Sequence, residues 1–324
     1  MRWDSGFYLH IASAGYVPPT PCPPESRYPP SDWCGNSAWF PGYPWLLGAL
    51  ARAAGIAPPT AAVWVSAIAQ LAFLLLLWIL LGDARQWPAL GLAAFFPGNV
   101  YLAAVFPLSL CLLATLSCIA WCWSANYRLA GIAAAIAATS YPTGVLLGAA
   151  VAIWAVLHRK WRAAWVTAGS LAGLLVVFGV MRLQTGIWDA FMRVQTKYAY
   201  SWKPLDSFGA RLKPLVNARY RDEKGFVTAL QTLASTLLVA AAFRDGFRRR
   251  WSERSSLVGL YLGAFWLFPV IIGSGVALYR SEALLAPAAL LLPGLPRWLQ
   301  LGFLAAAVLL SIPMASLFFR GVLF

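Results

Sequence analysis

Acidic residues are scarce in this sequence: Asp and Glu together account for only 11 of its 324 residues, and His for 2. All charged residues make up 11% of the chain, whereas hydrophobic residues make up 60%. Soluble domains carry about a quarter charged residues, so the composition excludes an ordinary soluble protein. Nearly everything after residue 40 has the pattern of apolar helix, which predicts an all-α polytopic membrane protein.

Signatures of several site classes are also missing. The sequence has no DxD motif and no Gly-rich phosphate loop in a convincing context. No His, Cys and carboxylate spacing suggests a metal, and His10 and His158 lie far apart. We therefore expect neither a metal site nor a cofactor.

The net charge of +14 does not indicate a nucleic-acid partner, because the Lys and Arg residues form short clusters between apolar runs. That pattern is typical of cytoplasmic loops in membrane proteins. We expect one membrane domain over 1–324, in contact with membrane lipids. It divides into an external segment at 1–61, spans at 62–182, a long external basic loop at 183–226 and further spans at 227–324.

The apolar runs predict the individual helices. Two breaks are expected, at Pro97-Gly98 and at 140–144, the second dividing a run that is too long for one crossing. A short interfacial helix is expected at 45–56. The predicted spans or apolar runs are 62–82, 88–105, 108–123, 129–157, 163–182, 227–243, 256–278, 283–294 and 299–319.

The basic clusters test how these spans alternate. If the clusters near Arg85, Arg128, 158–162, 244–254 and Arg297 are cytoplasmic, successive connections between spans lie on alternating sides of the membrane. The segments then predicted on the non-cytoplasmic face are 1–44, 106–109, 140–144, 183–226 and Tyr279-Arg280.

The first external segment holds an acidic residue among aromatic ones, Asp4, and a Pro-rich stretch at 17–37 that is predicted to form neither helix nor strand. Cys22 and Cys34 flank part of that stretch. A disulfide between them and two unpaired thiols are both compatible with the sequence.

The 183–226 loop interleaves eight Lys or Arg residues with four acidic residues and with aromatic ones such as Trp188, Tyr198 and Trp202. Cations pair with phosphate, and aromatic rings offer faces to sugars and anchor to the lipid interface. The alternative is that the loop merely holds anionic headgroups, that Asp4 caps a helix or is solvated, and that Arg280 snorkels or pairs locally.

The first external segment contains two specific motifs. They are Trp3-Asp4-Ser5-Gly6-Phe7-Tyr8-Leu9-His10-Ile11-Ala12 with Gly15-Tyr16, and Trp39-Phe40-Pro41-Gly42-Tyr43-Pro44. Both resemble the first external loop of PIG-V-like mannosyltransferases, which belong to the GT-C glycosyltransferases. Weaker similarities follow in the same order along most of the chain, among them Phe106-Pro107-Leu108-Ser109, Gln195 and Tyr279-Arg280.

The resemblance implies a GT-C-type helical bundle whose external loops form the site. It implies transfer of a sugar, mannose by this resemblance, from a polyprenyl-phosphate donor to an unknown glycan, lipid or protein acceptor. Asp4 would be the general base, and Arg280 would bind the donor phosphate. The further residues expected to bind substrate are Trp3, Tyr8, Tyr43, Gln195, Lys197 and Lys203.

The sequence departs from that family in three places. The family usually has a transmembrane helix before the Trp-Asp motif, whereas Met1 lies two residues ahead of Trp3, so either the true start lies upstream or the chain is a truncated relative. A second carboxylate is absent at 106–109, and an Arg is absent around Tyr141. These departures keep an inactive scaffold among the alternatives, beside a transporter or flippase of a lipid-linked substrate. The expected location is the bacterial plasma membrane, with the site facing the periplasm or exterior.

Overall fold

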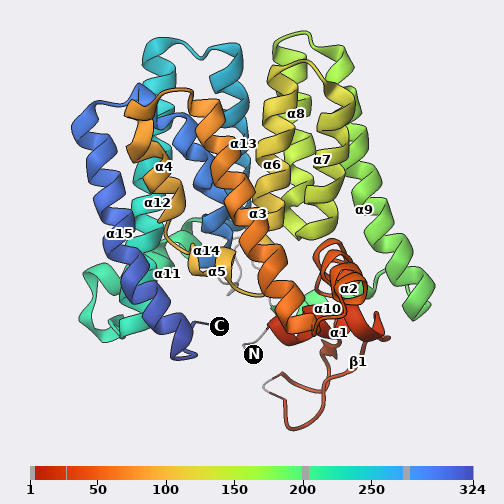
Figure 1. Ribbon diagram of the computed structural model, residues 1–324. Helices are drawn as coiled ribbons and strands as arrows, with labels where there is room; N and C mark the ends of the chain where they lie inside the picture. Colours follow the sequence, from red (N-terminus) through yellow and green to blue (C-terminus); the bar gives the residue numbers. More distant parts are fainter. Residues whose placement is uncertain (1–3, 27, 199–203, 273–277, 324) are drawn as a thin grey trace.

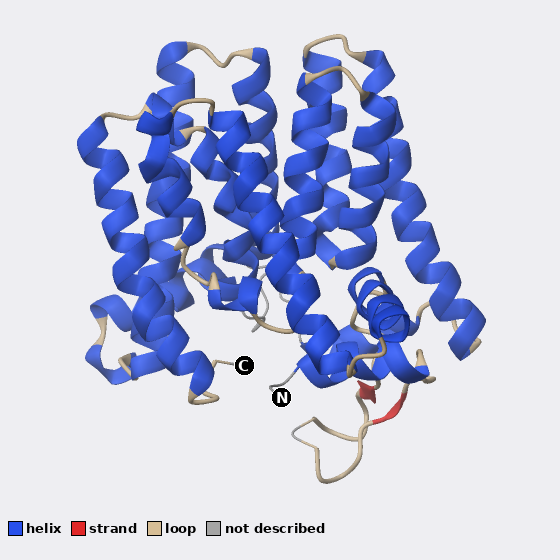
Figure 2. Cartoon of the chain, in the orientation of Figure 1, coloured by secondary structure: helices blue, strands red, loops and turns tan. Residues whose placement is uncertain are grey.

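The computed structural model describes residues 4–26, 28–198, 204–272 and 278–323, and it is 79% helical (Figures 1 and 2). Within these residues the only strands are β1 (Thr20–Pro21) and β2 (Trp33–Cys34), which pair antiparallel. The prediction of an all-α protein is confirmed. The two short strands correct the expectation that 17–37 holds none, because backbone pairing beside the cysteines forms a minimal ladder there.

Five helices are long and apolar enough to cross a membrane, as expected of an integral membrane protein. Their outer faces expose large apolar side chains, such as Leu71 and Ile79, which a bilayer would cover. The predicted spans at 62–82, 163–182, 227–243, 256–278 and 299–319 correspond to these helices, although 273–277 lies outside the described residues. They are α3 (Pro58–Leu81), α9 (Ala164–Thr185), α12 (Glu223–Arg249), α13 (Glu253–Ile272) and α15 (Arg297–Phe319).

Shorter helices complete the bundle. The expected run 108–123 is α6 (Leu108–Trp123), and 129–157 divides as predicted into α7 (Tyr127–Ser140), η2 (Pro142–Val145) and α8 (Leu146–Leu157). Tyr141 is extended at this break (φ −146°, ψ 141°), because a residue before proline disfavours the helical region.

The expected broken span at 88–105 is also found, as α4 (Trp87–Ala94) and α5 (Val100–Ala103), with η1 (Ala84–Gln86) ahead of α4. Gly98 lies in the break with φ +86°, and a Cβ there would come 2.7 Å from the Tyr279 carbonyl oxygen. Glycine is therefore required both by the backbone and by the close approach of a distant segment.

The last apolar region does not form α-helix throughout. The predicted run 283–294 consists of the 3-10 helices η6 (Glu282–Leu290) and η7 (Leu292–Gly294), preceded by α14 (Leu278–Ser281). Pro287 lies inside η6 and removes one amide donor. Most of η6 is buried, so neighbouring helices and not lipid cover this irregular backbone.

The connections gather at two ends of the bundle. The turns beside Arg85, Arg128, Arg159, Arg250 and Arg297 lie together at the top in Figure 1; we call this the basic-turn end. At the other end lie both termini, α1 (Asp4–Ala14), α2 (Gly42–Ala54), α10 (Ala190–Gln195) and α11 (Pro204–Val216); we call this the α1 end. The predicted alternation of the spans agrees with this arrangement.

Contacts between α8 and α13 fasten the bundle at the basic-turn end. Trp154 Nε1 donates to the Glu253 carbonyl oxygen at 2.8 Å, and Lys160 Nζ lies 3.1 Å from a carboxylate oxygen of Glu253. His158 Nε2 and Ser256 Oγ are 2.8 Å apart. Three side chains, Trp154, His158 and Lys160, thus join the C-terminal end of α8 to the first turn of α13.

Two segments predicted as loops are helical. Asp4–Ala14 forms α1 because Tyr8, Leu9 and Ile11 are buried against neighbouring helices, although Gly6 and two serines weaken its intrinsic propensity. In the 183–226 loop the described residues form four helical pieces. They are α10, η4 (Thr196–Tyr198), α11 and η5 (Ala218–Tyr220).

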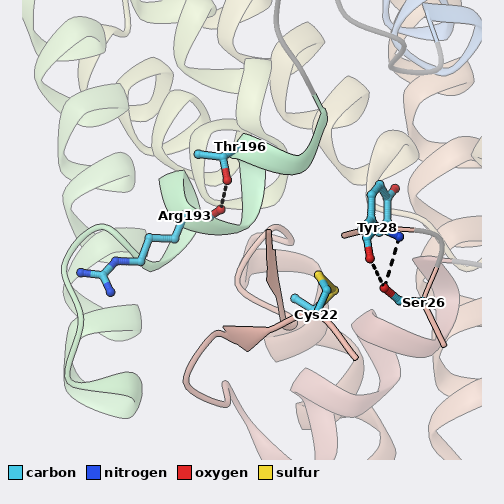
Figure 3. Close-up of a disulfide and its surroundings, with 6 residues drawn as sticks. Cys22, Ser26, Tyr28, Arg193 and Thr196 are labelled. Carbon is cyan, nitrogen blue, oxygen red and sulfur yellow. Dashed lines mark hydrogen bonds between the residues drawn. A yellow bond between two sulfur atoms is a disulfide. The ribbon is translucent and has the colours of Figure 1, made fainter. Parts of the chain in front are cut away.

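Cys22 and Cys34 form a disulfide at the α1 end (Figure 3). It closes a loop with a sequence separation of 12, which in the chain-entropy model stabilises the folded loop by about 3 kcal/mol. Of the two arrangements left open by the sequence, the bonded one is present. The other cysteines, Cys111, Cys118 and Cys122, are free and buried.

Thiol alkylation tests the disulfide directly. In SDS without reductant we expect an alkylating reagent to modify three cysteines, and with reductant all five. The Cys22→Ser variant should expose its four remaining thiols under both conditions. Five modified thiols in the unreduced wild-type chain would contradict the pairing.

Glycines allow α7 and α9 to approach closely. A Cβ on Gly169 would overlap the carbonyl oxygen of Gly131, and a Cβ on Gly173 would lie 2.6 Å from that of Ala135. Small residues at such crossings permit backbone contact between membrane helices.

We therefore expect Gly169→Val to lower the free energy of unfolding by about 1–3 kcal/mol, the usual cost of overpacking. SDS-induced unfolding in mixed micelles measures this change. Gly179→Val on the same helix is the matched control, because a Cβ at Gly179 meets nothing within 4 Å. Equal destabilisation by both substitutions would mean that the close crossing is not responsible.

Candidate functional site

Asp4 lies at the first turn of α1, on the helix face that points into the bundle. Tyr8 and Ile11 share this face, and their side chains are buried. Tyr8 and Ile11 follow Asp4 by four and seven positions, a spacing that places all three on the same side of a helix. Burial of Tyr8 and Ile11 therefore also orients the Asp4 carboxylate inward.

Arg280 is held in place by its neighbours in the chain. Gln231 of α12 donates from Nε2 to the Tyr279 carbonyl oxygen at 2.8 Å, and the Pro97 carbonyl oxygen lies 3.5 Å from the same nitrogen. The break between α4 and α5 and the short helix α14 thus meet at one amide side chain. Arg280 projects from this junction.

The two residues form an ion pair: Arg280 Nη1 donates to Asp4 Oδ2. They are separated by 276 positions in the chain. Their side chains are 20% and 19% exposed, so both charges are largely removed from water. The structure brings together the predicted base and the predicted phosphate ligand.

Aromatic rings surround the pair. The Arg280 guanidinium carbon lies 5.8 Å from the ring centroid of Tyr101 and 5.7 Å from that of Phe106, within the range of cation–π attraction. Tyr8 packs edge-to-face on Phe106, and Tyr101 lies beside Tyr279. The side chains around the ion pair are therefore mainly aromatic rings, several of which carry a phenol hydroxyl.

The electrostatics favour one protonation state for this cluster. Burial opposes the charge on Arg280, but the Asp4 carboxylate and the neighbouring tyrosines together outweigh burial and raise the pKa of Arg280 above its ordinary value. Burial, and then Asp4, also raise the pKa of Tyr8. At neutral pH Arg280 is a cation and Tyr8 a protonated phenol.

Arg280 Nε has no hydrogen-bond partner among the residues that the structure describes. The Tyr101 hydroxyl makes no hydrogen bond of regular geometry to them, although the Tyr279 hydroxyl is near. Buried polar groups are normally paired, and an unpaired one costs about 1–3 kcal/mol. A ligand that supplies oxygen acceptors would satisfy both. The arrangement can therefore accept an oxyanion.

Two further ionisable side chains, Glu282 and Arg211, lie near the ion pair. Glu282 is 4% exposed, and neither of its carboxylate oxygens accepts a hydrogen bond of regular geometry from a described residue, although Thr232 and Gln231 are near. Burial lowers the pKa of Arg211 on α11, and the nearby Glu282 and Tyr279 oppose that shift. Part of the 183–226 segment thus reaches the site.

The other predicted binding residues lie in different places. Tyr43 is fully buried, and its hydroxyl donates to the Ala62 carbonyl oxygen and contacts Ser66 Oγ, both at 3.0 Å. It thereby supports α2 against α3. Trp3 and Lys203 lie outside the described residues.

Lys197 and Gln195 are half-buried near the disulfide loop. The Lys197 ammonium lies 5.0 Å from the ring centroid of Tyr28 and 5.2 Å from that of Tyr198. Figure 3 shows Tyr28 beside the disulfide, with Arg193 and Thr196 on the neighbouring α10–η4 segment. These contacts place Lys197 with the disulfide loop and not with the ion pair.

Sequence reasoning missed Tyr101, Gln231 and the proximity of Arg211 to Glu282. A signal existed for the first two. Tyr101 follows the Pro97-Gly98 break directly, and Gln231 is a strongly polar residue within an otherwise apolar span. Polar side chains at membrane depth commonly mark functional positions.

Within the described part of the chain, no group of three His, Cys, Asp or Glu residues is suited to a metal. No family model, curated protein or solved structure matches this chain. The resemblance to PIG-V-like enzymes therefore stays a prediction that rests on the motifs themselves.

The ion pair should contribute measurably to stability. Breaking a fully buried pair costs about 3–5 kcal/mol, and an exposed pair contributes about 0–1 kcal/mol. For side chains one-fifth exposed, we expect a double-mutant cycle of Asp4→Asn and Arg280→Gln to give a coupling of about 1–3 kcal/mol in SDS unfolding.

The pair Glu223–Arg320 provides the matched control at the same end of the bundle. Its side chains are 53% and 55% exposed, so the cycle of Glu223→Gln and Arg320→Gln should give less than about 1 kcal/mol. A coupling for Asp4 and Arg280 no larger than this control would contradict the contact.

Proposed function

We propose that this protein is a membrane glycosyltransferase of the GT-C type that uses a polyprenyl-phosphate-linked sugar. The observation that carries the proposal is the meeting of Asp4 and Arg280 at the α1 end, where the buried Arg280 Nε lacks a partner among the described residues. A carboxylate and a guanidinium packed among aromatic rings supply the base and the phosphate-binding cation that sugar transfer from a phosphate requires. The resemblance in the first external segment specifies mannose as the sugar.

In the proposed reaction Asp4 is the general base. The acceptor oxygen attacks the anomeric carbon and forms the new glycosidic bond, while its proton passes to the Asp4 carboxylate. The bond between the anomeric carbon and the phosphate oxygen breaks with inversion, and its electron pair stays on polyprenyl phosphate. Asp4 must therefore be ionised and within hydrogen-bond reach of the acceptor hydroxyl.

Arg280 would bind the donor phosphate and stabilise the charge that develops on it. A guanidinium has five N–H donors, and the contact with Asp4 uses Nη1. Nε lacks a partner among the described residues and is buried, so donor binding would require the side chains around the guanidinium to move and let a phosphate oxygen reach it. Arg280 would then position base and donor together.

Two features support an active site on the non-cytoplasmic side. The basic turns lie at the opposite end, as expected of cytoplasmic loops. The Cys22–Cys34 disulfide lies at the α1 end, and disulfides persist in oxidising compartments. We propose a bacterial plasma membrane with the α1 end facing the periplasm or exterior.

A transporter or flippase is the alternative from another class. Transporters place ionisable residues and broken helices near the bilayer midplane. In the five long helices described here the charged residues lie near the helix ends, while Asp4, Arg280, Arg211 and Glu282 gather towards one end. This distribution favours the enzyme.

Transfer of radiolabelled mannose from polyprenyl-phosphate mannose into the lipid and protein fractions of membranes tests the function. We expect Asp4→Asn to lower transfer by at least about 100-fold, since a general base contributes about 10²–10⁴. Arg280→Ala should weaken the use of donor more than that of acceptor.

Glu223→Gln is the control, because Glu223 is an ion-paired carboxylate at the same end but outside the site. It should transfer normally. Full activity of Asp4→Asn would remove Asp4 from the mechanism, and absence of transfer in the wild type would favour a transporter or an inactive scaffold.

A further inference from the structure

An open depression of about 410 Å³ lies on the α1 end, on the other side of α1 from Asp4. It is lined by Gly6, Phe7, His10, Val17, Gly35 and Asn36. At about 100° per residue, Gly6, His10 and Phe7 project roughly 200°, 240° and 300° around the helix from Asp4, so Phe7 forms the edge of the depression nearest to Asp4. The depression is thus separate from the ion pair, although one helix borders both.

Hydrogen bonds fix the polar side of the depression. Asn36 Oδ1 accepts from the Val17 amide at 3.0 Å, and its Nδ2 donates to the Gly15 carbonyl oxygen at 2.9 Å and lies 3.1 Å from His10 Nδ1. Because Asn36 offers a donor there, Nδ1 of neutral His10 is the acceptor and Nε2 carries the proton. His10 is therefore a donor whose ring is oriented by a satisfied amide.

An aromatic ring forms another part of the lining. Phe7 stacks on Trp39 with ring centroids 3.8 Å apart and an interplanar angle of 12°. Trp39 is buried, whereas Phe7 is 38% exposed. One face of the Phe7 ring is thus covered and held rigid, and its exposed surface borders the depression.

Glycine at position 6 is not required by close packing in the part of the chain that the structure describes. It lies in the first turn of α1, and a Cβ there would meet no described atom within 4 Å. What a larger residue would do is fill the depression.

We propose that this depression is a saccharide-binding subsite for a part of the acceptor remote from the reacting hydroxyl. The volume falls within the range of small-molecule sites, which combine an apolar lining with few convergent polar groups. A pyranose ring fits this chemistry: its C–H face packs on the electron-rich ring of Phe7, and a ring hydroxyl accepts from His10 Nε2. The assignment to the acceptor rests on the proposed function, with transfer occurring at Asp4 across the helix.

Saturation-transfer NMR with methyl α-D-mannopyranoside as the probe tests the subsite on the full chain in nanodiscs. We expect saturation transfer to the sugar in the wild type and a loss of at least ten-fold in Gly6→Leu. Phe7→Ala, which removes the ring and leaves the space open, should also weaken the signal. Gly302→Leu is the matched control, because Gly302 is another helical glycine with nothing within 4 Å of its Cβ.

Asp4→Asn separates the subsite from the catalytic proposal. It should keep saturation transfer while losing sugar transfer, because Asp4 faces the other side of α1. If the probe binds, with the expected loss in Gly6→Leu, yet the membranes transfer no sugar, the subsite stands and the proposed function fails. No signal in the wild type, or an undiminished signal in Gly6→Leu, overturns the subsite.

Discussion

The contact between Asp4 and Arg280 is the interaction on which the α1 end depends. It joins a helix of 11 residues to one of 4, and helices this short are not stable by themselves. Each charge, largely removed from water, would be costly without the other. The rings of Tyr101 and Phe106 then pack against the guanidinium, so the ion pair and the aromatic lining stabilise one arrangement of segments from opposite ends of the sequence.

Much of the helical framework could be predicted because membrane spans have a strong local signal. The run of apolar residues determines α6 to the residue, and Pro142 and Pro97-Gly98 mark the breaks. α1 could not be predicted in this way, since its helix depends on burying Tyr8 and Ile11 against partners far along the chain. The same holds for η6, where packing around Pro287 selects 3-10 geometry over α-helix.

The candidate site was predictable only in part, for a related reason. Alternation of spans put Asp4 and Arg280 on one face, but their direct contact depends on the junction at Gln231, where two interrupted segments meet. Nothing local in the sequence indicates that Tyr101 lies against Arg280. Lys197 was expected at the site from its charge and instead packs on Tyr28, because the covalent loop closed by Cys22 and Cys34 provides rings within reach.

The seam between α8 and α13 has a consequence for how the bundle can move. Trp154, His158 and Lys160 join these helices at the basic-turn end, whereas the α1 end is built from interrupted segments and short helices. If these helices move relative to each other, the seam is the point of smallest displacement, in the manner of a hinge. Displacement grows with distance from a hinge, so such a motion would separate the segments most at the α1 end, against the Asp4–Arg280 contact.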